Sequence, residues 1–228
     1  MTVLRVTLIG AAGRMGKMIL DVAASDTNIE IVSKCDLGDD IELSLRNSDV
    51  AIDFSNANAI GEICHVALQH QRPLVIGTTG HLPEQRATIE KAAQSVPIVF
   101  ASNFSVGVNV LFALTRKAAK ILGSEFVPEI IETHHRMKKD APSGTAKTIT
   151  EILQDARQTR AEIPTQSIRE GDVVGEHTVI FGGPGEQLEL THRAGSREIF
   201  ARGALRAAQW VADKSPGLYS MQDVLGLS

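Results

Sequence analysis

The 228-residue sequence has little of several features that mark particular classes of protein. Its two cysteines, Cys35 and Cys64, do not support a disulfide framework, and a reducing compartment is the simpler expectation. No apolar run approaches the roughly 20 residues that a membrane-spanning helix needs. The first residues lack the basic region, apolar run and cleavage site of a signal peptide. These absences favour a soluble, cytoplasmic protein.

An excess of basic charge is also missing. The net charge of −4 gives no general attraction to nucleic acid or to an anionic membrane, so any affinity for an anion must be local. The apolar share of 43% and the charged share of 22% are ordinary for a globular protein. A chain of this length can form one large domain or two small ones.

Strand-like and helix-like patterns alternate over the first half of the chain. β-branched runs predict strands, and apolar residues at helical spacing predict the intervening helices. The strands are expected at 3–9, 29–35, 50–55, 72–80 with its turn, and 97–102, and the helices at 14–25, 56–71 and 83–96. This alternation predicts an α/β fold, a Rossmann-type doubly wound parallel sheet with right-handed crossovers.

The pattern changes after residue 104. The order becomes a long helix (106–122), a strand (127–135), a helix (143–157), a hairpin (177–193) and a helix (196–213), while 155–176 is polar and expected to be rich in loops. We therefore expect a dinucleotide-binding domain over 1–104, completed by about 205–228. A smaller α+β domain with an open mixed sheet, for substrate binding and oligomerisation, is expected over 105–204.

A glycine cluster, "GAAGRMG" at residues 10–16, separates the first strand from the first helix. Gly10 would permit the tight turn, Gly13 the approach of a pyrophosphate, and Gly16 close packing of helix on strand. The helix N-terminus would add N–H donors and a positive dipole end. The spacing is GxxGxxG rather than GxGxxG, so a plain strand-to-helix turn remains an alternative.

Asp36 ends the second strand, where an acidic side chain would accept hydrogen bonds from the adenosine ribose. Leu37 follows, so no arginine is there to neutralise a 2′-phosphate. We therefore expect NADH to be preferred, with use of NADPH left open because Arg14 and Lys34 are near. A solvated strand end is the alternative for Asp36.

Two further strand ends, "GTTG" at 77–80 and "ASNFS" at 101–105, would lie at the same edge of the sheet. Each is a weak signal alone, since either could be an ordinary turn. The complete set of expected cofactor-binding residues is Gly10, Ala12, Gly13, Arg14, Met15, Gly16, Asp36, Gly77, Thr78, Thr79, Ala101, Asn103 and Phe104.

The stretch "ETHHRMKKDAPSGTAKT" at 132–148 is crowded with cations. A metal site is not expected, because adjacent histidines on a strand point to opposite faces and no HxH or HExxH spacing occurs. A nucleic-acid patch is disfavoured by the acidic chain and the missing aromatics. A solvated loop remains open, and Arg136 and Lys139 stay unassigned.

A chemical interpretation of this stretch rests on its order. The hydroxyls of Ser143 and Thr145 and the first turn of the following helix can hold a carboxylate. Lys138 supplies a positive charge, and His134 titrates near neutrality. Together they suit a small dicarboxylate that is reduced, because hydride addition leaves negative charge that a positioned acid must quench.

The segments "GAAGRMG", "GTTG", "ASNFSVGVN", "ETHHRMKKDAPSGTA" and "HRAGSREIFARGALRAAQW" resemble, in this order, bacterial 4-hydroxy-tetrahydrodipicolinate (dihydrodipicolinate) reductases. The resemblance runs through nearly the whole chain, and this chain is short for the family. It implies NAD(P)H-dependent reduction of 4-hydroxy-tetrahydrodipicolinate to tetrahydrodipicolinate with loss of water, in lysine and diaminopimelate biosynthesis. It also implies a homotetramer built through the sheet of the second domain, with no nucleic-acid or membrane partner.

The resemblance further implies residue roles. The catalytic residues would be His134 and Lys138, and the substrate-binding residues His135, Ser143, Gly144, Thr145 and Arg193. Met137 stands where many relatives carry a polar residue, and Leu37 where some carry a basic one. Two other interpretations stay open: another two-domain NAD(P) oxidoreductase such as an aspartate dehydrogenase, and a non-catalytic NAD-binding regulator.

Overall fold

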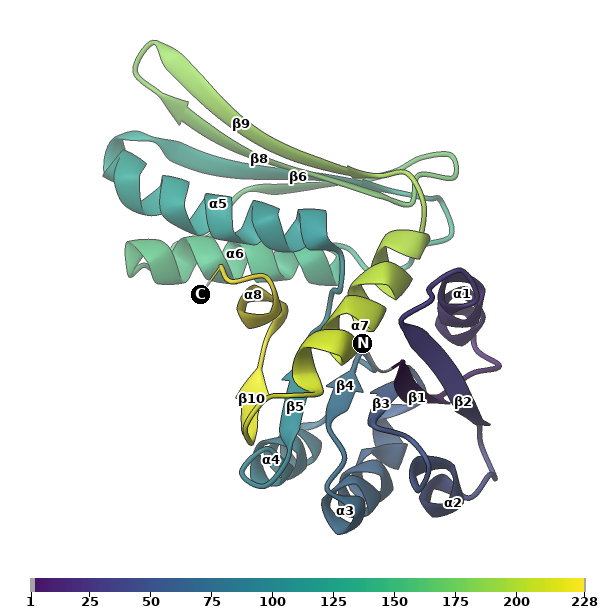
Figure 1. Ribbon diagram of the computed structural model, residues 1–228. Coiled ribbons are helices and arrows are strands. Elements are labelled where there is room, and N and C mark those ends of the chain that lie inside the picture. Colours follow the sequence, from purple (N-terminus) through teal and green to yellow (C-terminus); the bar gives the residue numbers. More distant parts are fainter. Residues whose placement is uncertain (1–2, 228) are drawn as a thin grey trace. The chain divides into compact units, whose positions relative to one another are not determined.

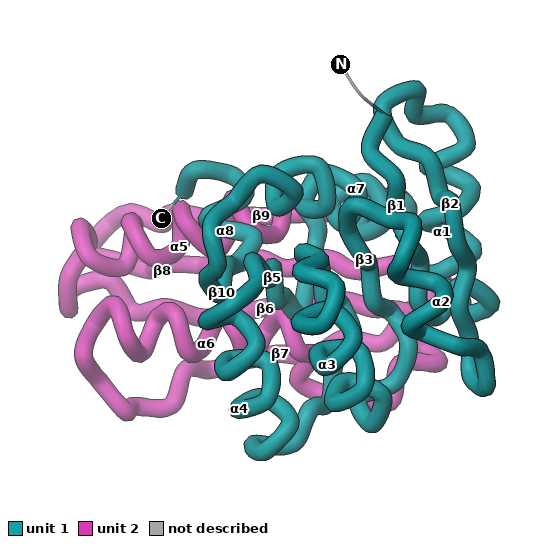
Figure 2. The backbone as a smooth tube through the Cα atoms, turned by 60° about the horizontal axis from the view of Figure 1, so that its bottom comes forward, with its two compact units in different colours: residues 1–105, 198–228 teal, residues 106–197 magenta. Residues whose placement is uncertain are grey.

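The computed structural model describes residues 3–227 and divides the chain into two compact units (Figure 2). Unit 1 comprises residues 1–105 and 198–228, and unit 2 comprises residues 106–197. The chain returns to unit 1 at Glu198 rather than near residue 205, because a single helix begins there. Within the described residues, no helix is both long enough and apolar enough to cross a bilayer.

Unit 1 is built on a six-stranded sheet in the order β10-β5-β4-β3-β1-β2, and its strand pairs are all parallel (Figure 1). The strands are β1 (Leu4–Ile9), β2 (Ile29–Cys35), β3 (Val50–Asp53), β4 (Leu74–Ile76), β5 (Pro97–Phe100) and β10 (Gly217–Tyr219). Such strands are buried on both faces, so they read as continuous apolar runs. The predicted doubly wound parallel sheet is confirmed.

Two separate clusters of buried side chains cover the two faces of this sheet. One cluster joins the strands to α1 (Arg14–Ala23), α7 (Glu198–Val211) and α8 (Met221–Val224). The other joins them to α2 (Ile41–Leu45), α3 (Ile60–His70), which follows the 3₁₀ turn η1 (Ala57–Ala59), and α4 (Pro83–Ala92). Helices therefore lie on both faces, as the alternating pattern predicts.

The strand order reverses at β1, because β2 lies on one side of it and β3 on the other. In open α/β sheets, ligands bind outside the carboxyl ends of the strands at such a switch point. The ends of β1 and β3 are thus the expected place for a nucleotide.

Unit 2 has a four-stranded sheet in the order β7-β6-β8-β9, in which β6 and β7 are parallel and the other pairs antiparallel. Its strands are β6 (Val127–His134), β7 (Thr165–Arg169), β8 (Gly175–Gly183) and β9 (Glu186–Ala194). The predicted open mixed sheet is confirmed. The expectation of loop over 155–176 missed β7, a polar strand whose place depends on pairing with β6.

Helices α5 (Val106–Leu122), which continues into the 3₁₀ turn η2 (Gly123–Glu125), and α6 (Gly144–Arg157) cover one face of this sheet (Figure 1). Alternate residues of β6 and β8, including Ile130, Val179 and Phe181, pack beneath them. Pro184 and Gly185 form the two-residue loop of the β8–β9 hairpin. Gly185 has a φ of 80°, a left-handed conformation that favours glycine.

Candidate active site

The glycine loop after β1 has the close approaches that a phosphate-binding turn requires. Gly10 has a φ of 83°, and a Cβ there would lie 2.5 Å from the carbonyl oxygen of Phe54. A Cβ at Gly16 would lie 2.2 Å from the carbonyl oxygen of Gly10, so the first helix could not pack so closely on the loop. Backbone is thereby exposed where a pyrophosphate needs it, and α1 begins directly after Gly13.

Asp36 lies beside this loop, and both of its carboxylate oxygens are 3.0 Å from the N–H of Ala12, which donates to them. A cavity of about 580 Å³ opens here between the ends of β1, β2 and β3. The charged side chains among its lining residues are all acidic: Asp36, Asp39 and Glu62. A cavity of this size, with an acidic residue at the end of the second strand, is typical of sites that bind the adenosine ribose of a dinucleotide.

A second cavity in unit 1, of about 810 Å³, continues along the same sheet edge. Of the expected cofactor residues, those that line it are Gly13, Arg14, Met15, Gly77, Thr78, Thr79, Asn103 and Phe104. Gly10, Gly13 and Asp36 line the first cavity. Ala101 lines neither and packs against the core, and Gly16 is buried inside α1.

One segment of this edge was not expected from the sequence. The segment that follows β3 lines both cavities through Phe54, Ser55, Asn56 and Asn58. The ring of Phe54 occupies the place of a side chain at Gly77, where a Cβ would lie 2.2 Å from it. The signal available was the strand end "VAIDFS", which has the same position in the sheet as the two strand ends that were chosen.

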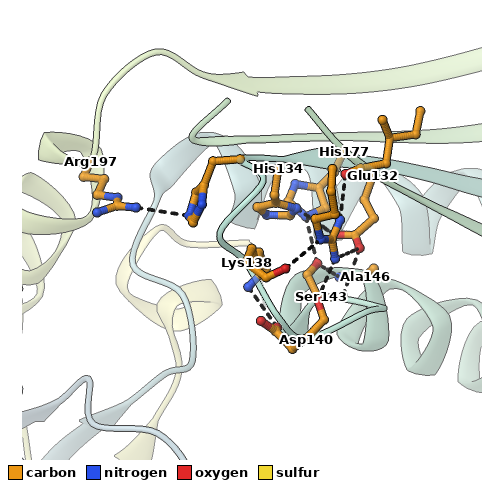
Figure 3. A network of polar contacts seen from close by, with 11 residues as sticks. Glu132, His134, Lys138, Asp140, Ser143, Ala146, His177 and Arg197 are labelled. Carbon is orange, nitrogen blue, oxygen red and sulfur yellow. Dashed lines mark hydrogen bonds and ion pairs between the residues drawn. The ribbon is translucent and has the colours of Figure 1, made fainter. Parts of the chain in front are cut away.

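In unit 2 the strand β6 brings a buried carboxylate to a buried imidazole (Figure 3). Glu132 and His134 are two residues apart on the strand and share a face. The Nδ1 atom of His134 lies 2.9 Å from Oε2 of Glu132. The other oxygen, Oε1, accepts hydrogen bonds from the N–H of Ser143 (3.1 Å) and from Nη2 of Arg169 (2.8 Å).

A second buried histidine, His177 on β8, completes the cluster. Its ring meets that of His134 edge-on, with centroids 5.0 Å apart. Its Nε2 lies 3.2 Å from Oγ of Ser143. The Ser143 hydroxyl also accepts the N–H of Ala146, so it caps the first turn of α6.

The pKa values of this cluster follow from burial and from the polar contacts. Burial raises the pKa of Glu132, but hydrogen bonds from Ser143 and Arg169 outweigh it and bring that pKa to about 2. Burial lowers the pKa of His177 to about 4, so this ring is neutral at pH 7. Burial also lowers the pKa of His134, while the charge of Glu132 acts in the opposite direction.

The loop after β6 is held by the same arginine. Nε of Arg169 donates to the carbonyl oxygen of Lys138, and Nη2 donates to that of Asp140. Nζ of Lys138 lies 2.8 Å from Oδ2 of Asp140, and this contact lowers the pKa of Asp140. The lysine is thus held in the loop that follows His134, with its side chain 23% exposed.

The other expected substrate-binding residues lie in different places. His135 is half-buried, and its Nε2 lies 3.3 Å from Nη2 of Arg197. Gly144 and Thr145 form the first turn of α6, and both are more exposed than Ser143.

Arg193 is not brought to this group. It pairs across the strands with Glu176, at 3.0 Å, and its side chain is 72% exposed. Its neighbour His192 pairs with His177, so Arg193 points to the opposite face of the sheet.

Glu132, His134 and His177 place three potential metal-ligand atoms within 4.8 Å of one another. Tetrahedral ligands at 2.0–2.2 Å from zinc would lie about 3.3 Å apart, farther than the 2.9 Å between Oε2 and Nδ1. The guanidinium of Arg169 also forms an ion pair with the Glu132 carboxylate, and its positive charge disfavours a metal ion there. The geometry is that of a carboxylate–imidazole pair.

Sequence reasoning missed Glu132, Arg169, His177 and Arg197 as members of this site. Glu132 and His134 show the period of two that places them on one strand face, which was a usable signal. His177 and Arg169 come from other strands, and their position depends on the strand register.

A doubly wound sheet, a glycine loop that leaves room for pyrophosphate, and a separate unit with buried acid–base groups define an oxidoreductase that uses a pyridine nucleotide. Residues 4–104 match the family model described as dihydrodipicolinate reductase, N-terminus, and residues 107–225 match the one described as its C-terminus. The chain belongs to the dihydrodipicolinate reductase family.

Individual relatives agree with this assignment. The chain is 49% identical to a 4-hydroxy-tetrahydrodipicolinate reductase of Akkermansia muciniphila over 237 residues, which cover 96% of each chain. It is 42% identical to that of Syntrophotalea carbinolica, covering 98% of this chain and 99% of the relative over 265 aligned positions. Among solved structures, a dipicolinate-bound dihydrodipicolinate reductase of Paenisporosarcina sp. TG-14 has a TM-score of 0.85 at 23% identity, covering 97% of this chain and 99% of that one. The last similarity concerns the fold.

Proposed function

We propose that this protein catalyses the NAD(P)H-dependent reduction of 4-hydroxy-tetrahydrodipicolinate to tetrahydrodipicolinate with loss of water, a step of lysine and diaminopimelate biosynthesis. The activity in the names of its relatives supports this proposal. The observation that carries it is the buried Glu132–His134 pair beside the N-terminus of α6, an acid next to a carboxylate-binding turn. Such a site suits an anionic substrate that must be protonated.

His134 is the proposed proton donor, and Lys138 the proposed cation that binds substrate and assists protonation. A bound nicotinamide nucleotide supplies the hydride. The proton of His134 then neutralises the negative charge that develops on the atom next to the reduced carbon. Lys138, released from Asp140, places a positive charge beside the same atoms.

The substrate carboxylate is proposed to lie at the first turn of α6, on Gly144 and Thr145. The N–H groups of a first helical turn and the positive end of the helix dipole favour an anion there. Ser143 contributes by capping this turn and holding His177, because its hydroxyl is buried and engaged. His135 and Arg197 are proposed to contact a second carboxylate, since their side chains already meet.

A coupled assay tests the activity: the substrate is generated by the preceding synthase, and the loss of NADH absorbance is followed. General acid catalysis contributes about 10²–10⁴-fold to a rate, so His134→Gln and Lys138→Ala should each reduce kcat within that range. The control is Lys139→Ala, because Lys139 is exposed and follows Lys138 directly in the sequence. This variant should keep native kcat. A near-native kcat in either site variant refutes the role given to that residue.

A regulator that binds NAD without turnover would share the cavities of unit 1. Titration calorimetry with dipicolinate in the presence of NADH separates it from the enzyme. The enzyme should bind dipicolinate, and His134→Gln or Lys138→Ala should weaken that binding. Binding of NADH alone, with no dicarboxylate binding and no turnover, identifies a regulator.

NADH is the proposed preferred cofactor. The acidic side chains around the first cavity would repel the 2′-phosphate of NADPH, and Asp36 is placed to accept hydrogen bonds from ribose hydroxyls. The ratio of kcat/KM for NADH to that for NADPH measures the preference. A tenfold or greater preference for NADPH refutes it.

The proposed assembly is a homotetramer formed through the sheet of unit 2. In the described residues of that unit, α5 and α6 both lie on one face of the sheet (Figure 1). Its other face carries the alternate side chains of the strands, such as Ile131, Thr178 and Ile180. The strand β9 is an edge strand with nine residues. Uncovered faces and long edges of this kind are commonly closed by another copy of the chain.

A further inference from the structure

We propose that Glu132 is the positioning residue of His134: its buried carboxylate holds Nδ1 of the ring and thereby leaves Nε2 as the nitrogen that exchanges protons with substrate. This inference rests on the proposed function only in taking the partner of the proton exchange to be the substrate. The orientation and the tautomer of the ring are properties of unit 2 that can be measured without turnover.

The Glu132 carboxylate is buried and held in place by hydrogen bonds. Glu132 has no exposed surface, and Oε1 is held by the N–H of Ser143 and the guanidinium of Arg169. A buried charge is stable only when its oxygens are paired. With Oε1 fixed in this way, Oε2 lies 2.9 Å from Nδ1 of His134, closer than the 3.9 Å that separates it from Nε2 of His177.

The position of Oε2 also selects the tautomer of the His134 ring. An ionised carboxylate accepts hydrogen bonds and cannot donate them, so the ring nitrogen beside it must carry the hydrogen. The neutral form of His134 is therefore the Nδ1–H tautomer. The opposite nitrogen, Nε2, points to the side of Gly175, where a Cβ would lie 3.1 Å from it.

The charged groups around His134 act on its pKa in opposite directions. The titratable groups that face His134 are Glu132 on its own strand, His177 on β8, Arg169 on β7, and Lys138 and Asp140 in the loop. Burial and the cations Lys138 and Arg169 lower the pKa of His134, whereas Glu132 and Asp140 raise it. Glu132 stays ionised because its own pKa is about 2, and it is the closest of these charges. It thus opposes the lowering of the pKa of His134 that burial and the two cations cause.

A purely structural role is the rival interpretation, in which Glu132 serves as the counter-ion that fixes Arg169 and hence β7. Both roles predict that loss of the carboxylate harms the protein. They differ in whether the tautomer and the pKa of His134 change in a variant that still folds.

The decisive measurement is nitrogen NMR of protein labelled with ¹⁵N-histidine, with His134 assigned by comparison with His134→Gln. The wild type should show the Nδ1–H tautomer at high pH. In Glu132→Gln the pKa of His134 should fall, because the charge that raises it is gone. Glu132→Asp keeps the charge and the arginine pair, withdraws the oxygen from Nδ1, and should give an intermediate pKa.

The kinetic counterpart is the pH profile. A general acid must be protonated, so activity falls as the pH rises through the pKa of His134, and this limb should move to lower pH in Glu132→Gln. The kcat should fall about 10–100-fold, a part of what a general acid contributes, with little change in KM. Glu129→Gln is the matched control, since Glu129 lies on the same strand and is exposed.

The pH range of these experiments is set by the other two buried groups. His177 has a pKa of about 4 in the folded protein and near 6.5 when unfolded, so the folded state loses stability as the pH falls below about 6.5. Glu132 contributes stability above its unfolded pKa and loses it only in acid. The titration of His134, whose pKa is itself lowered from 6.5, is therefore followed together with a check of folding at each pH below about 6.5.

An Nε2–H tautomer in the wild type overturns the inference, as does a folded Glu132→Gln variant with an unchanged pKa for His134. If Glu132→Gln does not fold, the wild-type tautomer and Glu132→Asp still decide. The expected NMR result combined with no turnover by the wild type would support the positioning role while refuting the proposed function.

Discussion

At the scale of single residues, the proposed preference for NADH can be tested at the position after Asp36. Leu37 is fully exposed beside the acidic cavity, so its replacement should not disturb folding. In Leu37→Arg, a guanidinium could pair with the 2′-phosphate of NADPH. We expect kcat/KM with NADPH to rise about tenfold, since such a bond contributes about 1.5–3 kcal/mol and less when exposed.

The control for this prediction is Leu43→Arg. Leu43 is a second exposed leucine, 64% accessible on α2, and it does not line the cavity. Leu43→Arg adds the same charge to unit 1 but cannot contact the 2′-phosphate. The ratio of kcat/KM for NADPH to that for NADH should therefore stay native. An equal rise in both variants would mean that net charge, and not the position of the guanidinium, controls the choice.

At the scale of elements, strand β8 has glycine where it passes His134. A Cβ at Gly175 would lie 3.1 Å from Nε2 and 3.4 Å from Cδ2 of that ring, tighter than an ordinary contact. In Gly175→Ala the imidazole must therefore shift by a few tenths of an ångström. We expect kcat to fall about tenfold, because small displacements of a catalytic group are costly.

Gly182 on the same strand provides the comparison. Its added Cβ would meet a single atom, the carbonyl oxygen of Val127, at an ordinary 4.0 Å. Gly182→Ala should keep native kcat and gain up to about 1 kcal/mol in the free energy of unfolding, because alanine restricts the unfolded chain. Steady-state kinetics and thermal unfolding of both variants test this. A native kcat in Gly175→Ala would show that the ring has room to spare.

At the scale of the whole molecule, strongly patterned segments were predictable. The strand 29–35 and the helix 106–122 agree with β2 and α5 residue for residue, because long periodic runs carry their own signal. The strand β7, with sequence TQSIR, has no such pattern. It exists because β6 offers a parallel partner and because Arg169 meets a buried carboxylate there.

The two sites differ in the same way. The residues proposed to bind the nucleotide form short local segments at strand ends, so spacing in the sequence is enough to predict them. The acid–base cluster joins Glu132 to Arg169, 37 residues away, through strand pairing that no local pattern encodes. Strand alternation could have shown that Arg193 and its neighbour His192 face opposite sides of the sheet.

The proposed homotetramer can be tested on the face of the unit 2 sheet that α5 and α6 do not cover. Ile180 is half-buried at its centre, paired in register with Glu129 on β6 and Glu189 on β9. In Ile180→Lys, the two glutamates can neutralise the new charge within one chain, so each copy should still fold. In the assembly, the lysine and its glutamates would instead be taken out of water against their symmetry-related copies, and this desolvation disfavours association.

We therefore expect Ile180→Lys to convert a species of four times 24.5 kDa into smaller ones, measured by light scattering after size exclusion. Leu43→Lys, the same class of change on α2, should leave the native mass. Unit 1 should keep its affinity for NADH in both variants, because its cavities are formed within that unit. A wild-type protein that is monomeric, or an Ile180→Lys protein of native mass, would place the contacts between copies elsewhere than on this sheet.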